Sequence, residues 1–245
     1  MFKAVIFDMD GVIKITMKKL LFTLFTFISF SLSAQQMAFN TVDITAEPNS
    51  QDDLIKLFDE FFADANFKSG GIILERLRHG REDGRTHRLV WLWELNNGGR
   101  VEGDMEKFEN AAFWGQFNNH IESWGSAKAG RIMSWQDGDV KEFPMGHIWD
   151  ISPKDPAAFK KAHDKIVKQA PDVFANRVVG FGTYDINRPN GATHWVVIGG
   201  TGFNGHLSMH QDLEDNYTKA MNQYFVNRGE VEHVQDFIVE VLARY

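Results

Sequence analysis

The chain has 245 residues, of which 43% are hydrophobic and 24% are charged, with 21 Phe and 7 Trp but only 6 Pro. This is the composition of a globular protein, and it excludes collagen and wholesale disorder. Acidic residues outnumber basic ones by 33 to 26, which gives a net charge of −7, so we expect no nucleic-acid partner. The chain has no Cys, which excludes disulfides, thiolate metal sites and a cysteine nucleophile.

Residues 1–13 read MFKAVIFDMDGVI, an apolar run that ends in two aspartates and a glycine. The segment resembles motif I of the haloacid dehalogenase-like phosphatases. The resemblance implies Asp8 as nucleophile, Asp10 as general acid and Mg²⁺ as the metal. The later motifs of that family have no convincing match, so a Mg-dependent phosphatase is kept as an alternative function. The other interpretation is that residues 1–16 are a tag-like or misassigned extension.

Residues 17–34 read MKKLLFTLFTFISFSLSA and have the three parts of a secretory signal peptide. Lys18 and Lys19 supply the positive charge, an apolar stretch follows, and Ala34 suits a cleavage site. The apolar stretch is too short to span a bilayer as a helix. We therefore expect a secreted or periplasmic protein with no stable membrane span after cleavage.

The remaining sequence predicts the same six elements twice. In the first half, a strand over 37–45 precedes a helix capped by Ser50, and two strands over 70–79 and 86–95 form a hairpin. The next helix is predicted from the apolar positions Phe108, Ala111, Ala112, Phe117, Ile121 and Trp124. A strand over 129–135 closes the half.

In the second half, a strand over 146–151 leads into a helix with Asp155 as N-cap and Pro156 at its first position. A hairpin follows, with strands over 177–186 and 193–198. Ser208 and Gln211 have the spacing of a capping box, which predicts a helix start at Ser208. The final strand is predicted over 234–243.

Each half is thus a β-α-β-β-α-β ferredoxin-like unit, with boundaries predicted at 37–143 and 144–245. In a single unit of this kind, helices cover one face of the sheet. The many aromatic residues indicate that the other face is buried too, which happens when the two sheets pack face to face. The fold class is α+β, with two tandem repeats that form a pseudo-dimeric α/β barrel. It resembles the dimeric α/β-barrel superfamily, which includes antibiotic-biosynthesis monooxygenase-like, stress-responsive barrel and chlorite dismutase-like proteins.

Two histidines are the candidate catalytic residues because they occupy matching places. His87 and His194 each follow a Thr and open the third strand of their half. If both face the barrel interior, they flank one pocket as bases, donors or ligands. The alternative is that each is a strand-end histidine bonded to nearby backbone.

Five further residues are candidate ligand contacts. Trp91 and Trp93 share one face of a strand, and His147 and Trp149 share one face of another, where they suit a flat aromatic ligand or a haem. Tyr184 is the fifth. His206 and His210 have a spacing that could bind a metal, but the Glu-x-x-His or His-Glu context is missing, and solvation at a helix start is the favoured explanation.

The leading prediction is a barrel protein that binds a small apolar or aromatic molecule. A more specific version of this prediction adds monooxygenase-like or haem-dependent activity. The resemblance implies that a histidine would hold a haem iron, without identifying which one. The alternatives are the Mg-dependent phosphatase and a structural or partner-binding barrel. We expect either a monomeric pseudo-dimer or a homodimer.

Overall fold

The computed structural model describes residues 36–80 and 84–245. The predictions on Asp8, Asp10 and the signal peptide therefore lie outside the described residues. Among the helices that are described, none has both the length and the apolar character needed to cross a membrane.

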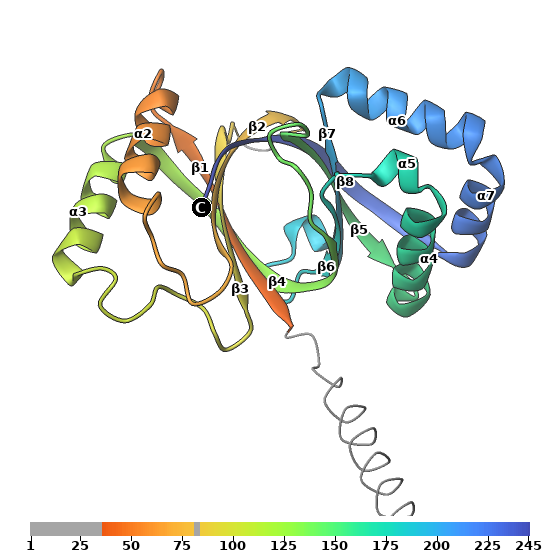
Figure 1. The fold of residues 1–245 in the computed structure, drawn as a ribbon, viewed down its shortest axis with the longest axis horizontal. Helices are drawn as coiled ribbons and strands as arrows, with labels where there is room; N and C mark the ends of the chain where they lie inside the picture. Colours follow the sequence, from red (N-terminus) through yellow and green to blue (C-terminus); the bar gives the residue numbers. More distant parts are fainter. Residues whose placement is uncertain (1–35, 81–83) are drawn as a thin grey trace, which may run out of the picture. The chain divides into compact units, whose positions relative to one another are not determined.

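Eight antiparallel strands close into a barrel with helices outside it (Figure 1). The strands are β1 Met37–Ala46, β2 Gly71–His79, β3 His87–Glu94, β4 Ile121–Gln136, β5 Met145–Pro153, β6 Val179–Thr183, β7 His194–Gly200 and β8 Val231–Arg244. The helices are α2 Gln51–Phe62, α3 Lys107–Asn118, α4 Pro156–Gln169, α5 Pro171–Phe174, α6 Phe203–Asn216 and α7 Thr218–Asn227, with a 3₁₀ turn at Pro189–Gly191.

The strand order confirms the tandem arrangement. Around the barrel the strands run β1-β3-β2-β8-β5-β7-β6-β4. The first four strands therefore lie side by side as β4-β1-β3-β2, and the last four repeat this order as β8-β5-β7-β6. The two sheets join at β2–β8 and at β4–β6. At each junction the second strand of one repeat pairs with the last strand of the other repeat, since β6 is the counterpart of β2 and β8 is the counterpart of β4. The barrel therefore has the pseudo-twofold symmetry of a dimer within one chain.

Local sequence signals explain where several elements begin. The Asp155 side chain accepts hydrogen bonds from the backbone N–H groups of Ala157 and Ala158, at 3.1 and 3.0 Å, and Pro156 occupies the first turn of α4. This is the N-cap that the sequence predicts. Ser50 is the N-cap residue of α2, as predicted, but its side chain makes no capping hydrogen bond. Helix α2 buries one apolar face on the first sheet through Leu54, Leu57, Phe58 and Phe62.

Two predicted boundaries are wrong. Helix α3 ends at Asn118, and Ile121 and Trp124, which we expected on that helix, belong to β4. Helix α6 begins at Phe203 after Gly202, so Ser208 is inside the helix and caps nothing. The long last helix also divides at Tyr217 into α6 and α7.

Strand alternation divides the side chains between the barrel lumen and two outer helix layers. On β3, Val90 and Leu92 face the lumen, while Leu89 and Trp91 pack in the helix layer of the first repeat. The lumen cluster includes Phe39, Ile132, Ile148, Tyr184, Trp195, Phe237 and Val239. A strand with apolar residues on both faces is therefore buried on both, as the sequence predicts.

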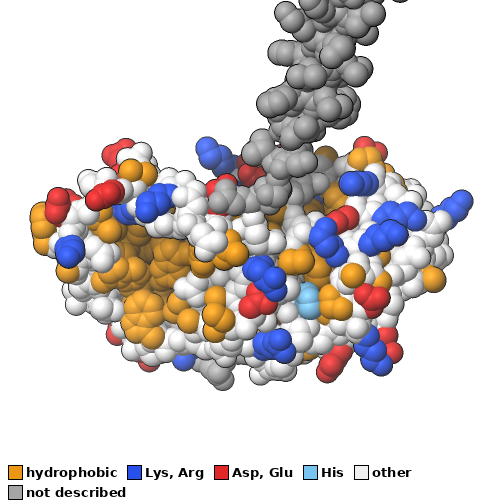
Figure 2. All heavy atoms as spheres, turned by 90° about the horizontal axis from the view of Figure 1, so that it is seen from below, with side chains coloured by type: hydrophobic (Ala, Val, Ile, Leu, Met, Phe, Trp, Pro, Cys, Tyr) orange, Lys and Arg blue, Asp and Glu red, His pale blue; other side chains and the backbone are white. Residues whose placement is uncertain are grey.

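The two helix layers differ in coverage. Only α2 and α3 lie outside the first sheet, whereas α4, α5, α6 and α7 lie outside the second (Figure 1). Hydrophobic side chains also gather in a hollow on the side of the first repeat (Figure 2). In that repeat Phe108 is 70% exposed and Trp124 is 44% exposed.

Candidate functional site

A cavity lies between the second sheet and its helices; we call it the second-repeat cavity. It contains about 1150 Å³ of empty space, including its open mouth. Its walls are mostly apolar and come from β5, β6, β7, α4, α5, α6 and α7. They include Trp149, Ile151, Phe159, Ile166, Val196, Ile198, Met209, Leu213, Met221 and Tyr224. Apolar walls with a few polar groups are typical of small-molecule sites.

His163 on α4 is the most buried polar residue of this wall, at 5% exposure. Its Nε2 is buried and has no hydrogen-bond partner among the described residues. The ring stacks near Phe159, with centroids 6.4 Å apart, and near Phe181, at 5.9 Å. A buried polar atom that lines an apolar cavity and lacks a partner needs an explanation, and a bound molecule is one.

The other nitrogen of His163 faces a carboxylate. Nδ1 lies 3.5 Å from Oδ1 of Asp164. Hydrogen bonding to His163 holds the pKa of the Asp164 carboxyl well below its ordinary value, and hydrogen bonds from Lys160 and Ser134 add to this. Asp164 is therefore ionised. In the tautomer that donates Nδ1–H to Asp164, Nε2 carries the lone pair.

The mouth of the second-repeat cavity is polar. His210, Glu214, Arg228 and His233 complete its lining. The Arg228 guanidinium lies over the ring of Tyr224, with 5.2 Å from its central carbon to the ring centroid. The cavity thus has a polar rim with one cation, Arg228, and one carboxylate, Glu214, around an apolar interior.

The predicted pair His147 and Trp149 is on the outer face of β5, and its two rings stack with centroids 3.7 Å apart. Trp149 lines the second-repeat cavity. His147 does not line it; its Nε2 lies 3.2 Å from Oδ1 of Asp236. Burial lowers the pKa of His147, which keeps the ring neutral near pH 7.

His206 and His210 have different environments. His206 is 3% exposed, its Nε2 lies 3.2 Å from the carbonyl oxygen of Met145, and burial lowers its pKa to about 4. His210 is exposed at the rim of the second-repeat cavity. In the described part of the chain, no three His, Asp or Glu residues gather closely enough to hold a metal ion.

His87 and His194 occupy equivalent positions but share no pocket. In each, Nδ1 bonds to the hydroxyl of the preceding Thr, at 2.9 Å from Thr86 and 2.8 Å from Thr193. Both rings are on the helix side of their sheets, because their neighbours Arg88 and Trp195 line the lumen. The expectation of one site between them is wrong: the barrel wall separates them.

The remaining predicted ligand contacts are divided between compartments. Trp91 packs on Trp114 in the first helix layer, with centroids 6.3 Å apart. Trp93 lies on the same strand face and contacts Gly98. Tyr184 is inside the barrel, where its hydroxyl donates to Oδ1 of Asp150 at 2.7 Å. Of the five, only Trp149 lines the second-repeat cavity.

Sequence reasoning missed His163 and the ion pair between Glu75 and Arg88 inside the barrel. The signal for His163 was present, since it shares a helix face with Phe159, Ala162 and Ile166. A lone histidine in such a row is typical of a helix core position. The signal for the ion pair was weaker, because a charged residue on a strand normally faces water.

Comparison with known proteins supports the fold. No protein-family model matches the chain, and no curated protein matches it significantly. A proposed monooxygenase of Lactobacillus acidophilus aligns over 85% of this chain and 95% of its own, with a TM-score of 0.57 at 12% identity. One of Fusobacterium nucleatum aligns over 86% and 94%, with a TM-score of 0.55 at 10% identity.

The fold is that of the dimeric α/β barrels. A chlorite dismutase of Candidatus Nitrospira defluvii also aligns, over 86% of this chain and 94% of its own, with 11% identity. The TM-score of this alignment is 0.45. The two monooxygenase likenesses concern the barrel architecture alone, which is not that expected of the phosphatase alternative.

Proposed function

We propose that the second-repeat cavity binds a small apolar, aromatic molecule with Nε2 of His163 as its polar anchor. The observation that carries the proposal is the buried, unpartnered Nε2 in the wall of an apolar cavity. An aromatic ligand suits the cavity because Trp149, Phe159 and Tyr224 offer ring faces and edges. A hydroxyl group on the ligand would donate a hydrogen bond to Nε2 and so fix the orientation of the ligand.

The reaction class we propose is monooxygenase-like, with His163 as general base. Neutral Nε2 accepts a proton from an acidic hydroxyl or C–H of the aromatic ligand, and the carboxylate of Asp164 stabilises the imidazolium that forms. The resulting carbanion, or the carbon conjugated to the resulting oxyanion, forms a C–O bond with dioxygen as co-substrate, and His163 returns the proton to the distal oxygen. The hydroperoxide then loses its second C–H hydrogen as its O–O bond breaks, which leaves a carbonyl group and releases water, so the substrate itself supplies all four electrons. Proposed monooxygenases with this fold support the class but do not identify the substrate.

Haem is the second candidate ligand of the second-repeat cavity, and the carboxylate beside the imidazole of His163 favours it. Histidines that hold a metal commonly donate their other ring N–H to a carboxylate, as Nδ1 of His163 can to Asp164. His163 would hold the iron, and Arg228 and His233 at the mouth could pair with propionates. Haem, when bound, would supply redox chemistry to the site.

Secretion or a periplasmic location remains part of the proposal and rests on residues 17–34 alone. In that setting the protein would meet small molecules from the surroundings. A homodimer is not needed to complete the cavity, because residues of one chain line it.

Titration of the purified protein with hemin and with 2-naphthol tests the proposal. Saturable 2-naphthol binding, or a Soret band that forms at one equivalent of hemin, is expected for the unmodified chain, and His163→Leu should abolish it. The control is His87→Leu, because His87 is also 5% exposed with an unpartnered Nε2 but lines neither the second-repeat cavity nor the barrel lumen. Equal loss in both variants, or no binding of either compound, would contradict the proposal.

A further inference from the structure

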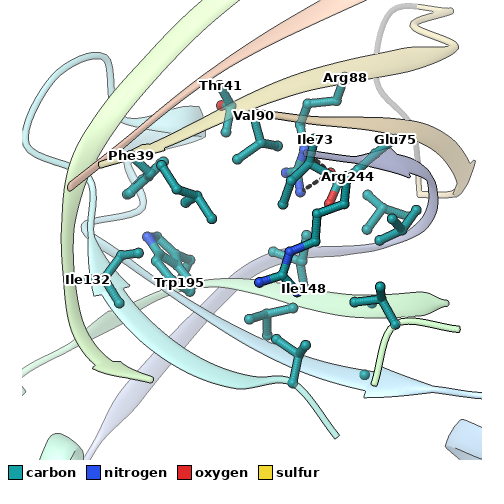
Figure 3. Close-up of a pocket in the computed structure, with 18 of the residues that line it drawn as sticks. Phe39, Thr41, Ile73, Glu75, Arg88, Val90, Ile132, Ile148, Trp195 and Arg244 are labelled. Atoms are coloured by element: carbon teal, nitrogen blue, oxygen red, sulfur yellow. Dashed lines mark hydrogen bonds and ion pairs between the residues drawn. The ribbon is translucent and has the colours of Figure 1, made fainter. Parts of the chain in front are cut away.

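The barrel lumen contains a second cavity, distinct from the proposed site and separated from it by the second sheet. It includes about 850 Å³ of empty space with its open end. Strands of both repeats line it, and most of the lining is aliphatic or aromatic (Figure 3). Among the labelled side chains, Phe39, Ile132 and Ile148 form apolar walls. The polar or charged side chains of Thr41, Glu75, Arg88 and Arg244 interrupt these walls.

A buried ion pair occupies one wall of this barrel cavity. Nε and Nη2 of Arg88 each lie 2.7 Å from the same oxygen, Oε2, of Glu75. The side chains of Arg88 and Glu75 are 10% and 9% exposed. Since one carboxylate oxygen takes both contacts, Nη1 of Arg88 keeps donor capacity, Oε1 of Glu75 keeps acceptor capacity, and the pair as a whole is neutral.

Trp195 supplies an unsatisfied donor on the opposite wall. Its side chain packs against Gly182, where a Cβ would lie 2.4 Å from the indole ring, and edge-on against Phe39 at 5.4 Å. The residue is 8% exposed, and its Nε1–H is buried with no acceptor within the described ranges. The ring is thus held by packing while its only polar atom is left without a protein partner.

Arg244 adds a positive charge that the lumen does not neutralise. It lies near the end of β8, and Figure 3 shows its side chain extending in among the other lining groups. Its ion-pair partner is Asp137, at 3.2 Å, whose side chain is 66% exposed and does not line the cavity. Among the residues that line this cavity, Arg244, Arg88 and Trp195 are donors and Glu75 is the only carboxylate. The nearby carboxylates of Asp43 and Asp150 already accept from Lys128 and from Tyr184 and Gln235.

We propose that the barrel cavity binds an apolar carboxylic acid, with its hydrocarbon body in the lumen and its carboxylate held by Arg244. An excess of donors in the lining, and a cation whose ion-pair partner Asp137 is at the surface outside the cavity, select an acceptor-rich anion over an amine or an alcohol. The apolar walls select against small hydrophilic anions. Trp195 donates to an oxygen of the ligand and completes the hydrogen bonding of the lumen.

Calorimetric titration of the full chain with decanoate and with 2-naphthoate, each below its aggregation concentration, tests this site. At least one acid should bind saturably at one equivalent, and at least tenfold more tightly than its uncharged counterpart, decan-1-ol or 2-naphthalenemethanol. This comparison uses the unmodified protein. Equal affinity of acid and alcohol, or no saturable binding of either acid, would overturn the proposal.

Variants locate the binding. Arg244→Gln should weaken the acid at least tenfold and leave the alcohol unchanged, and Trp195→Phe should weaken it several-fold. The control His163→Leu alters only the second-repeat cavity and should leave acid binding intact. Loss of acid binding in His163→Leu would place the acid in the other cavity and overturn this proposal, whereas failure of 2-naphthol or hemin binding leaves it standing.

Discussion

Tyr184 donates a 2.7 Å hydrogen bond to Asp150, a carboxylate with no solvent exposure. The two residues join β5 to the chain after β6 on the inner side of the second sheet, in which β7 lies between these strands. Gln235 donates to the other carboxylate oxygen at 2.8 Å. Burial raises the pKa of Asp150, although its bonds from Tyr184 and Gln235 oppose the shift. The carboxylate therefore depends on these two donors.

Tyr184→Phe should lower the free energy of unfolding by about 1–3 kcal/mol, because one donor to a buried carboxylate is lost while ring packing is kept. Urea denaturation at pH 7 measures the change. Tyr217→Phe is the matched control, since that hydroxyl bonds to Asp172 at the surface at 3.4 Å, and it should change stability by less than about 0.5 kcal/mol. Equal effects would mean that the Asp150 bond contributes nothing.

His87 gives the fold a predicted acid sensitivity. Burial, with the charge of Arg76 as a smaller cause, lowers the pKa of His87 from 6.5 to about 4. The unfolded chain therefore binds the proton first as pH falls, and the stability contribution is present above pH 6.5 and lost as pH falls toward 4. His87→Leu should flatten the stability profile over this range. His79→Asn, at an exposed position, should leave it unchanged, and an unaltered His87→Leu profile would disprove the assignment.

Two glycines should respond in opposite directions to alanine. At Gly182 a Cβ would meet the Trp195 ring and the carbonyl oxygen of Arg131, at 2.4 and 2.5 Å. Gly182→Ala should destabilise the protein by about 1–3 kcal/mol. At Gly115 in α3 nothing lies within 4 Å of the added atom, so Gly115→Ala should stabilise by about 0.5–1 kcal/mol. Thermal unfolding of both variants checks the pair, and a tolerated Gly182→Ala would refute the close ring packing.

The barrel should fold without its first 34 residues. All eight strands begin after residue 36, and each repeat completes the other through β2–β8 and β4–β6. Residues 35–245 should therefore unfold in one cooperative thermal transition, at the midpoint of the full chain within a few degrees. A broad, non-cooperative melt of residues 35–245 would show that the extension is needed.

The sequence predicts the repeat because hydrophobic period and turn signals recur in the same order. It misplaces the end of α3 because Phe117, Ile121 and Trp124 continue helical spacing into β4, and Ile121 packs in the same core as Phe117. The false start at Ser208 has a similar cause, since the Ser–Gln spacing of a capping box also occurs inside a helix.

The site is harder to predict than the fold because tertiary packing forms it. Alternation places His87 and His194 on matching faces but leaves open which face is the lumen. His163 has the sequence pattern of a core residue, and only the packing of α6 and α7 around it forms a cavity. Side chains alternate along β3, and Leu89 and Trp91 pack in the helix layer, so Arg88 faces the lumen.

The most direct test of the central claim is a long-range ¹H–¹⁵N correlation spectrum of the histidine rings, recorded with and without saturating 2-naphthol. The account predicts that the Nε2 resonance of His163, assigned with His163→Leu, shifts on binding while those of His87 and His194 do not. A ligand that binds while the His163 resonances stay in place would contradict the account.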